Sequence, residues 1–124
     1  MKKKIKPKHL YVVTRRDLSA GYQGVQSQHA LADFAFHYPE EFRVWRRESN
    51  YLAWLSVQDE NELKRLAIKI GLSNIKLVAF FEPDKMFQMT AIAIEPGVKS
   101  ARLLKNLPLA LIDLQYPIVM GDRS

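Results

Sequence analysis

The residues of this sequence best suited to chemistry lie between Arg15 and Phe36, in the segment RRDLSAGYQGVQSQHALADFAF. On a helix that begins near residue 22, a turn of 100° per residue places five polar side chains within an arc of roughly 80°. A surface helix usually carries Lys and Glu, whereas this stripe carries phenol, amide, imidazole and carboxylate groups. The stripe is therefore a candidate catalytic or binding face, and the alternative is an amphipathic helix with its polar face in water. Its members are Tyr22, Gln26, His29, Asp33 and His37.

A strand is expected to deliver the chain to this helix. The apolar run from His9 to Thr14 predicts a buried first strand, and an Asp-Leu-Ser-Ala-Gly turn follows it. The helix is expected to end near Tyr38, because Pro39 fixes a boundary. Caps and apolar spacing predict the other elements: a helix over 39–47, a strand over 51–57, a helix over 59–71, strands over 76–81 and 89–95, and a helix over 100–107.

The predicted order, β-α-α-β-α-β-β-α, indicates an α/β domain with a small four-stranded mixed sheet flanked by helices. Helical connections favour parallel strands, and the short link after residue 81 favours an antiparallel pair. We expect Phe42 and Trp45 to be packing residues. Residues 1–8 are expected to be a basic, flexible tail and 9–124 a single domain. The aliphatic extension from about residue 108 should cover a surface or a sheet edge, or form part of a dimer contact.

Composition narrows the classes of function. The 124 residues include no cysteine, which excludes disulfides, thiolate catalysis and cysteine zinc sites. No signal peptide or 18-residue apolar run is present, so we expect a cytoplasmic protein without a membrane partner. The net charge is +6, but five of the nineteen basic residues lie within the first eight positions. The remaining fourteen nearly balance the thirteen acidic residues, so the predicted phosphate affinity is concentrated in particular segments.

The segments VVTRRDL and GYQGVQSQHALADF resemble the signature of the type 2 peptidyl-tRNA hydrolases. In that family a first strand leads through Arg-x-Asp-Leu into Gly-Lys-x-x-x-Gln-x-x-His-Ala, and the resemblance implies the same α/β fold over about residues 9–107. The chain departs from the pattern where the family has its lysine, because Tyr22 stands there and no Lys or Arg lies between Arg16 and Arg43. Allowing a turn shorter by two residues, the matching positions are Arg15, Asp17, Leu18, Gly21, Gln26, His29 and Ala30.

The resemblance also implies a reaction, the attack of water on the ester that joins a peptide to the terminal ribose of tRNA. Such hydrolysis needs a base, donors for the oxyanion and a grip on phosphates. Thr90 matches a threonine that opens the family's last strand, whereas the link FFEPDKMFQ is shorter than the family's aspartate loop. No metal or other cofactor is expected. The candidate catalytic residues are His29, Glu82 or Asp84 as base, Gln26 and Thr90 as donors or water positioners, with Tyr22 and Asp17 beside them.

The expected partner is peptidyl-tRNA or another RNA, bound by a protein that we expect to be a homodimer. One alternative is a non-catalytic RNA-binding or regulatory protein that keeps the fold without the charged group, and another is a protein whose polar helix face meets a small molecule or a protein. A third alternative, at i,i+4 spacing, is a metal held by His29, Asp33 and His37. The candidate RNA-binding residues are Arg15, Arg16, Lys3, Lys4, Arg43, Arg46 and Arg47.

Overall fold

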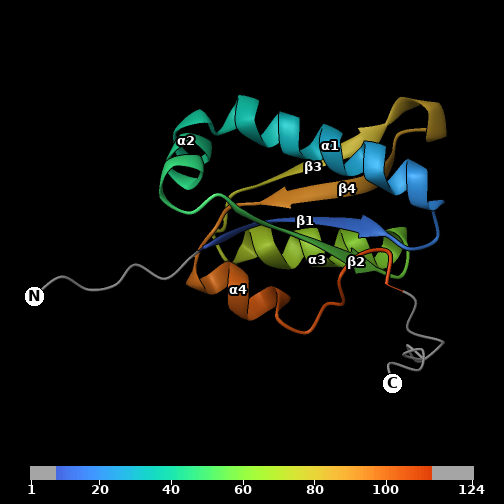
Figure 1. Ribbon diagram of the computed structural model, residues 1–124. Coiled ribbons are helices and arrows are strands. Elements are labelled where there is room, and N and C mark those ends of the chain that lie inside the picture. The colour runs from blue at the N-terminus through green and yellow to red at the C-terminus, as the bar shows by residue number, and fades with distance from the viewer. Residues whose placement is uncertain (1–7, 113–124) are drawn as a thin grey trace, which may run out of the picture.

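The computed structural model describes residues 8–112, which form one sheet with helices on both faces (Figure 1). The element order agrees with the predicted one, and a 3₁₀ turn, η1, joins the last two strands. Within residues 8–112, no helix has the length and apolar character needed to cross a membrane. The elements are β1 (His9–Arg15), α1 (Ala20–His37), α2 (Pro39–Glu48), β2 (Tyr51–Val57), α3 (Glu60–Leu72), β3 (Leu77–Glu82), η1 (Pro83–Lys85), β4 (Gln88–Ile94) and α4 (Val98–Leu104).

The sheet has the strand order β2-β1-β4-β3 and is mixed, as predicted. β1 and β2, which two helices connect, are parallel, and Val13 lies opposite Leu55. β4 is antiparallel to both β1 and β3, and Val13 also lies opposite Ile92 of β4. β1 and β4 therefore form the centre of the sheet, and in β4 every residue from Met89 to Ile94 is buried.

Alternate side chains of β1 face opposite layers, which explains its nearly continuous apolar sequence. Leu10 and Val12 pack in the core under α1 and α2, together with Trp45. Val13 packs in the second core, beneath α3 and α4 (Figure 1). Trp45 is buried and Phe42 packs against the same cluster, so the predicted packing role of these two aromatic residues is confirmed.

The face of α1 that meets the sheet differs from the predicted polar and apolar faces. The helix begins two residues earlier than expected, because the Ser19 side chain caps it and accepts a hydrogen bond from the Tyr22 backbone NH. The face that packs on the sheet cuts across the predicted polar stripe: Gln26 lies against the sheet, whereas His29 and His37 are exposed. The buried residues of α1 are Gln23, Gln26, Ala30 and Phe34.

The chain after β4 closes the far edge of the sheet. α4 ends at Leu104, earlier than predicted, and Gly97 occupies its N-cap position. The segment beyond it runs along β2, where the Ser56 NH donates to the Pro108 carbonyl at 2.9 Å and the Ala110 NH donates to the Trp54 carbonyl at 2.8 Å. Of the three predicted roles for the C-terminal extension, its described part covers a sheet edge. The remainder, 113–124, lies outside the described residues, as does most of the predicted basic tail.

Two neighbouring phenylalanines of α1 test this packing. Phe34 is fully buried, so Phe34→Ala should lower the free energy of unfolding by about 3–5 kcal/mol through lost burial and a residual cavity. Phe36 is 80% exposed, and Phe36→Ala should change it by less than about 0.5 kcal/mol. Urea unfolding followed by circular dichroism measures both values. Equal losses in the two variants would contradict the described orientation of α1.

Candidate functional site

Three segments meet at the carboxyl end of β1: the turn into α1, the first turns of α1, and the link from β3 through η1 to β4 (Figure 1). These segments carry the sequence motifs that the resemblance singled out, although 75 positions separate Arg15 from Thr90. The antiparallel pairing of β1 with β4 brings the start of β4 beside the end of β1. The candidate site is built from two polar clusters at this end of the sheet.

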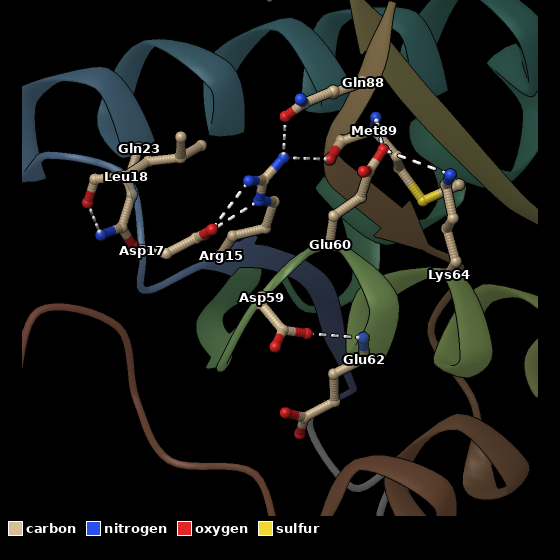
Figure 2. Close-up of polar contacts among 10 residues, drawn as sticks. All are labelled: Arg15, Asp17, Leu18, Gln23, Asp59, Glu60, Glu62, Lys64, Gln88 and Met89. Carbon is tan, nitrogen blue, oxygen red and sulfur yellow. Dashed lines mark hydrogen bonds and ion pairs between the residues drawn. The ribbon is translucent and has the colours of Figure 1, made fainter.

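The first is the Arg15 cluster, made of Arg15, Asp17, Gln88 and Met89 (Figure 2). Arg15 is 6% exposed, and its guanidinium donates two hydrogen bonds to the Asp17 carboxylate, at 2.9 and 2.8 Å. A third nitrogen donates to the Gln88 side chain at 2.9 Å and to the Met89 carbonyl at 3.2 Å. Arg15 therefore ties the turn after β1 to the beginning of β4, and its donors are committed within the protein.

The charged groups of the Arg15 cluster stabilise each other in their ionised forms. Hydrogen bonding from Arg15 holds the pKa of the Asp17 carboxyl below its usual range. The same hydrogen bond raises the pKa of Arg15, and the nearby carboxylates of Glu60 and Asp59 raise it further. Glu60 also accepts a hydrogen bond from the Met89 backbone NH at 2.8 Å (Figure 2). A phosphate would have to displace Asp17 to reach Arg15, which argues for a positioning role.

The second is the Gln26 cluster, made of Gln26, Glu82 and Thr90, whose side chains are at most 9% exposed. The Thr90 hydroxyl donates to the Gln26 amide oxygen at 2.6 Å, and the Gln26 amide NH₂ donates to Glu82 at 3.0 Å. The other oxygen of Glu82 accepts from the Asp84 backbone NH at 3.2 Å and so caps η1. Three of the predicted site residues are thus joined, and Glu82 is a buried acceptor that fixes the link.

A parallel set of buried contacts involves residues that the sequence patterns did not single out. Gln23 accepts from the Thr14 hydroxyl at 3.0 Å and donates to the Leu18 carbonyl at 2.7 Å. The Trp54 indole NH donates to Thr14 at 2.8 Å. Gln23 lies three residues before Gln26 and shares its helix face, which was the available signal once the helix start was known. These contacts hold α1 against β1 and β2.

One turn of α1 before Gln26, the protein presents a phenol and, beside it, an ammonium group from η1. The Lys85 ammonium lies 5.2 Å from the centre of the Tyr22 ring. Partial desolvation raises the pKa of the Tyr22 hydroxyl, and the carboxylates of Glu82 and Asp84 raise it further. Tyr22 is consequently a neutral hydrogen-bond donor near pH 7, beside a cation that η1 provides. Lys85 was not identified as a site residue from the sequence, because only the folded link brings it to Tyr22.

The link that carries Lys85 has an unusual backbone. Met86 and Phe87 both adopt positive φ angles, 54° and 58°, which residues with side chains rarely occupy. Both side chains are largely exposed, at 89% and 68%. The Phe87 NH donates to the Glu82 carbonyl at 2.9 Å, which closes the turn. Consecutive left-handed residues cost of order 1–3 kcal/mol each and are concentrated at functional sites.

His29 lies apart from the two clusters. Its ring stacks on Phe80, with ring centres 4.5 Å apart and planes 4° apart. No hydrogen bond joins its imidazole to Glu82, Asp84 or any other described side chain. Over residues 8–112, no group of three or more His, Asp or Glu side chains could hold a metal ion, which leaves the proposed metal clip on this helix without support.

The predicted RNA-binding residues are distributed over both ends of the molecule. Arg16 is exposed and contacts the Ser56 hydroxyl at 3.2 Å, beside the Arg15 cluster. The α2 arginines line a shallow groove of about 490 Å³ near the C-terminal end of α1, which at 1.5 Å per residue lies about 22 Å from Tyr22. Lys3 and Lys4 lie outside the described residues. The α2 arginines are Arg43, which pairs with Glu40, and Arg46 and Arg47.

Comparison with known proteins adds no assignment, because no protein-family model and no curated protein sequence matches this chain. The geometry of the two clusters and the sequence resemblance are therefore the basis for a function.

The Asp17 carboxylate gives a test of the Arg15 cluster. The pKa of the Asp17 carboxyl is lower in the folded than in the unfolded protein. The ionised carboxylate therefore stabilises the fold at a pH above the unfolded-state pKa, and this stabilisation is lost as the pH falls through the folded-state pKa. Asp17→Asn should lower the free energy of unfolding by about 1–2 kcal/mol at pH 7, a value reduced by the 41% exposure of Asp17. The deficit should shrink as the pH is lowered below about 4.

The control is Asp33→Asn on α1, whose carboxylate forms no hydrogen bond or ion pair with another described residue. Urea unfolding between acidic and neutral pH measures both variants against the wild type. A deficit in Asp17→Asn that does not change with pH would show that the ion pair is not the source of the stabilisation.

Proposed function

We propose that this protein is an ester hydrolase that acts on peptidyl-tRNA. The observation that carries the proposal is that Gln26 and Thr90, distant in sequence and both part of the resemblance, are hydrogen-bonded to each other one helical turn after a neutral phenol that carries a cation on its ring. The resemblance supplies the reaction, and the described geometry supplies groups suited to it. Arg15 and Asp17, also part of the resemblance, brace the same end of the sheet.

In the proposed reaction, Tyr22 and Lys85 stabilise the oxyanion. The carbonyl oxygen of the ester becomes negatively charged when water attacks, and a charged donor holds it about twice as strongly as a neutral one. The chain has no lysine at position 22, but the Lys85 ammonium lies over the Tyr22 ring. Lys85 therefore restores a positive charge at the point where the helix itself provides only a hydroxyl.

Asp84 is the best-placed base for this arrangement. Its carboxylate is close enough to Tyr22 to raise the pKa of the phenol, and it lies on exposed backbone next to Lys85. His29 follows Tyr22 by seven residues, which is about 10 Å along a helix, and it stacks on Phe80. Glu82 is buried with both oxygens engaged, so it positions Gln26 and the link instead of meeting water.

A second candidate function, RNA binding without catalysis, is favoured by one observation. The buried side-chain polar atoms of the described residues all have hydrogen-bond partners, so the Gln26 cluster is complete without a substrate. A structural cluster under an exposed surface would keep the fold while contributing nothing to bond cleavage. The hydrolysis assay separates the two functions.

The first experiment is hydrolysis of a defined peptidyl-tRNA by the purified protein. Lys85→Ala should lower kcat about 10²-fold or more, because the oxyanion loses its charged partner, and Lys85→Arg should retain part of the rate. Lys69→Ala removes an equivalent exposed charge from α3 and should leave the rate unchanged. Absence of turnover by the wild type would reject the enzyme and leave the RNA-binding function.

A second pair of variants identifies the base. Asp84→Asn should abolish turnover with little change in the thermal midpoint, because this exposed carboxylate forms no hydrogen bond or ion pair with another described residue. His29→Ala should retain most of the activity, since the imidazole lies along the helix from Tyr22. Loss of turnover in His29→Ala alone, with the fold intact, would assign the base to His29 instead.

A further inference from the structure

A second groove lies at the opposite end of β1, between the first residues of that strand and α4. It has a volume of about 410 Å³. The six residues that separate His9 from Arg15 at about 3.3 Å each place it roughly 20 Å from the candidate site. The groove is lined by Lys8, His9, Tyr11, Gly97, Val98, Ala101, Arg102 and Lys105.

The charge of this groove has one sign. Lys8, Arg102 and Lys105 line it, and no carboxylate does. Among residues 8–112, the four ion pairs involve other cations, so these three have no carboxylate partner within 4 Å in that part of the chain. The sequence from 98 to 107 contains three basic residues and no acidic one. Unpaired cations around a concave surface attract an anion.

The surface on the other side of Lys8 has the opposite charge. A cavity of about 300 Å³ there is lined by Glu40, Glu41, Glu48 and Glu95 beside Trp45 and Val44. A polyanion would be repelled from that cavity and directed toward α4. A long anion at this end of the sheet would therefore follow the basic groove beside α4.

Aromatic rings lie next to the basic groove. The His9 ring is centred 5.9 Å from that of Tyr11 and 5.6 Å from that of Tyr51. Tyr51, on the neighbouring strand, is 51% exposed. A basic groove bordered by accessible aromatic rings is the arrangement that binds single-stranded nucleic acid, in which cations follow the phosphates and bases stack on the rings.

We propose that this groove binds the phosphate backbone of a single-stranded RNA segment, with a base stacked at the His9 and Tyr51 rings. The inference deepens the proposed function, because it assigns the RNA part of the substrate to the end of the sheet opposite the ester. A ligand that occupies both places must span roughly 20 Å. The body of a tRNA is long enough, whereas a short acyl ester contacts only the Tyr22 end.

The test is binding of a labelled oligouridylate of about 12 nucleotides to the full chain, followed by fluorescence anisotropy over a range of salt concentrations. Arg102→Ala/Lys105→Ala should weaken binding several-fold and reduce the slope of log affinity against log salt by about 1.4, or 0.7 for each lost phosphate contact. Arg65→Ala/Lys69→Ala removes the same charge from exposed positions of α3 and should leave the slope unchanged.

Unchanged RNA binding by Arg102→Ala/Lys105→Ala, or an equal loss in the α3 control, would overturn the proposal. Binding of phosphatidylglycerol vesicles without binding of RNA would also overturn it, in favour of a lipid surface. Tyr51→Ala should weaken RNA binding without changing the salt slope, because stacking displaces no counterions.

Hydrolysis separates this proposal from the proposed function. Arg102→Ala/Lys105→Ala should raise KM for peptidyl-tRNA and leave cleavage of a short N-acyl aminoacyl ester unchanged. If the wild type cleaves neither substrate but the variant still loses RNA binding, the proposed hydrolase activity is rejected and the proposed RNA-binding groove is supported. If the wild type cleaves peptidyl-tRNA and the variant has an unchanged KM and unchanged RNA affinity, the proposed RNA-binding groove is rejected and the proposed hydrolase activity is supported.

Discussion

The structure of the candidate site depends on the burial of one primary amide. Gln26 is 1% exposed, and a buried amide needs partners for both its oxygen and its NH₂ group. Thr90 supplies the donor and Glu82 the acceptor, so the amide connects α1 to the start of β4 and to the end of β3. An apolar residue at position 26 would leave a buried carboxylate without this donor. The position of the link, and of Lys85 on it, follows from this requirement.

Most of the fold could be predicted because its determinants are local. The apolar runs of β1 and β4, the Asp59 cap that accepts from the Glu62 NH at 2.9 Å, and Pro39 at the start of α2 each act within a few residues. The mixed sheet followed from the lengths of the connections. The start of α1 was misplaced by two residues because the Ser19 cap was not recognised. The burial of Gln26 was not predicted either, because the groups that satisfy its amide, Thr90 and Glu82, are distant in sequence.

The site was less predictable, because its contacts join residues far apart in sequence. Gln26, Glu82 and Thr90 were named as candidates, but their mutual hydrogen bonds depend on the register of β3 and β4, which includes an irregularity between Phe80 and Phe81. Lys85 could not be identified, since nothing in the sequence places it over Tyr22. The two proposed phosphate-binding arginines also differ in a way the sequence does not reveal: Arg15 is buried against Asp17, and Arg16 is exposed.

A cation carried by a link differs physically from one carried by a helix. A lysine on α1 would be fixed by the helix, whereas Lys85 reaches Tyr22 from a turn whose two following residues have positive φ angles. Glu82 opposes the strain of that turn by accepting from both the Asp84 NH and Gln26. The buried Gln26 cluster and the exposed charge of Lys85 are therefore energetically connected: weakening the first releases the backbone that holds the second. Such a connection accounts for a fully satisfied polar cluster next to the proposed catalytic groups, since the cluster would maintain their geometry without reacting.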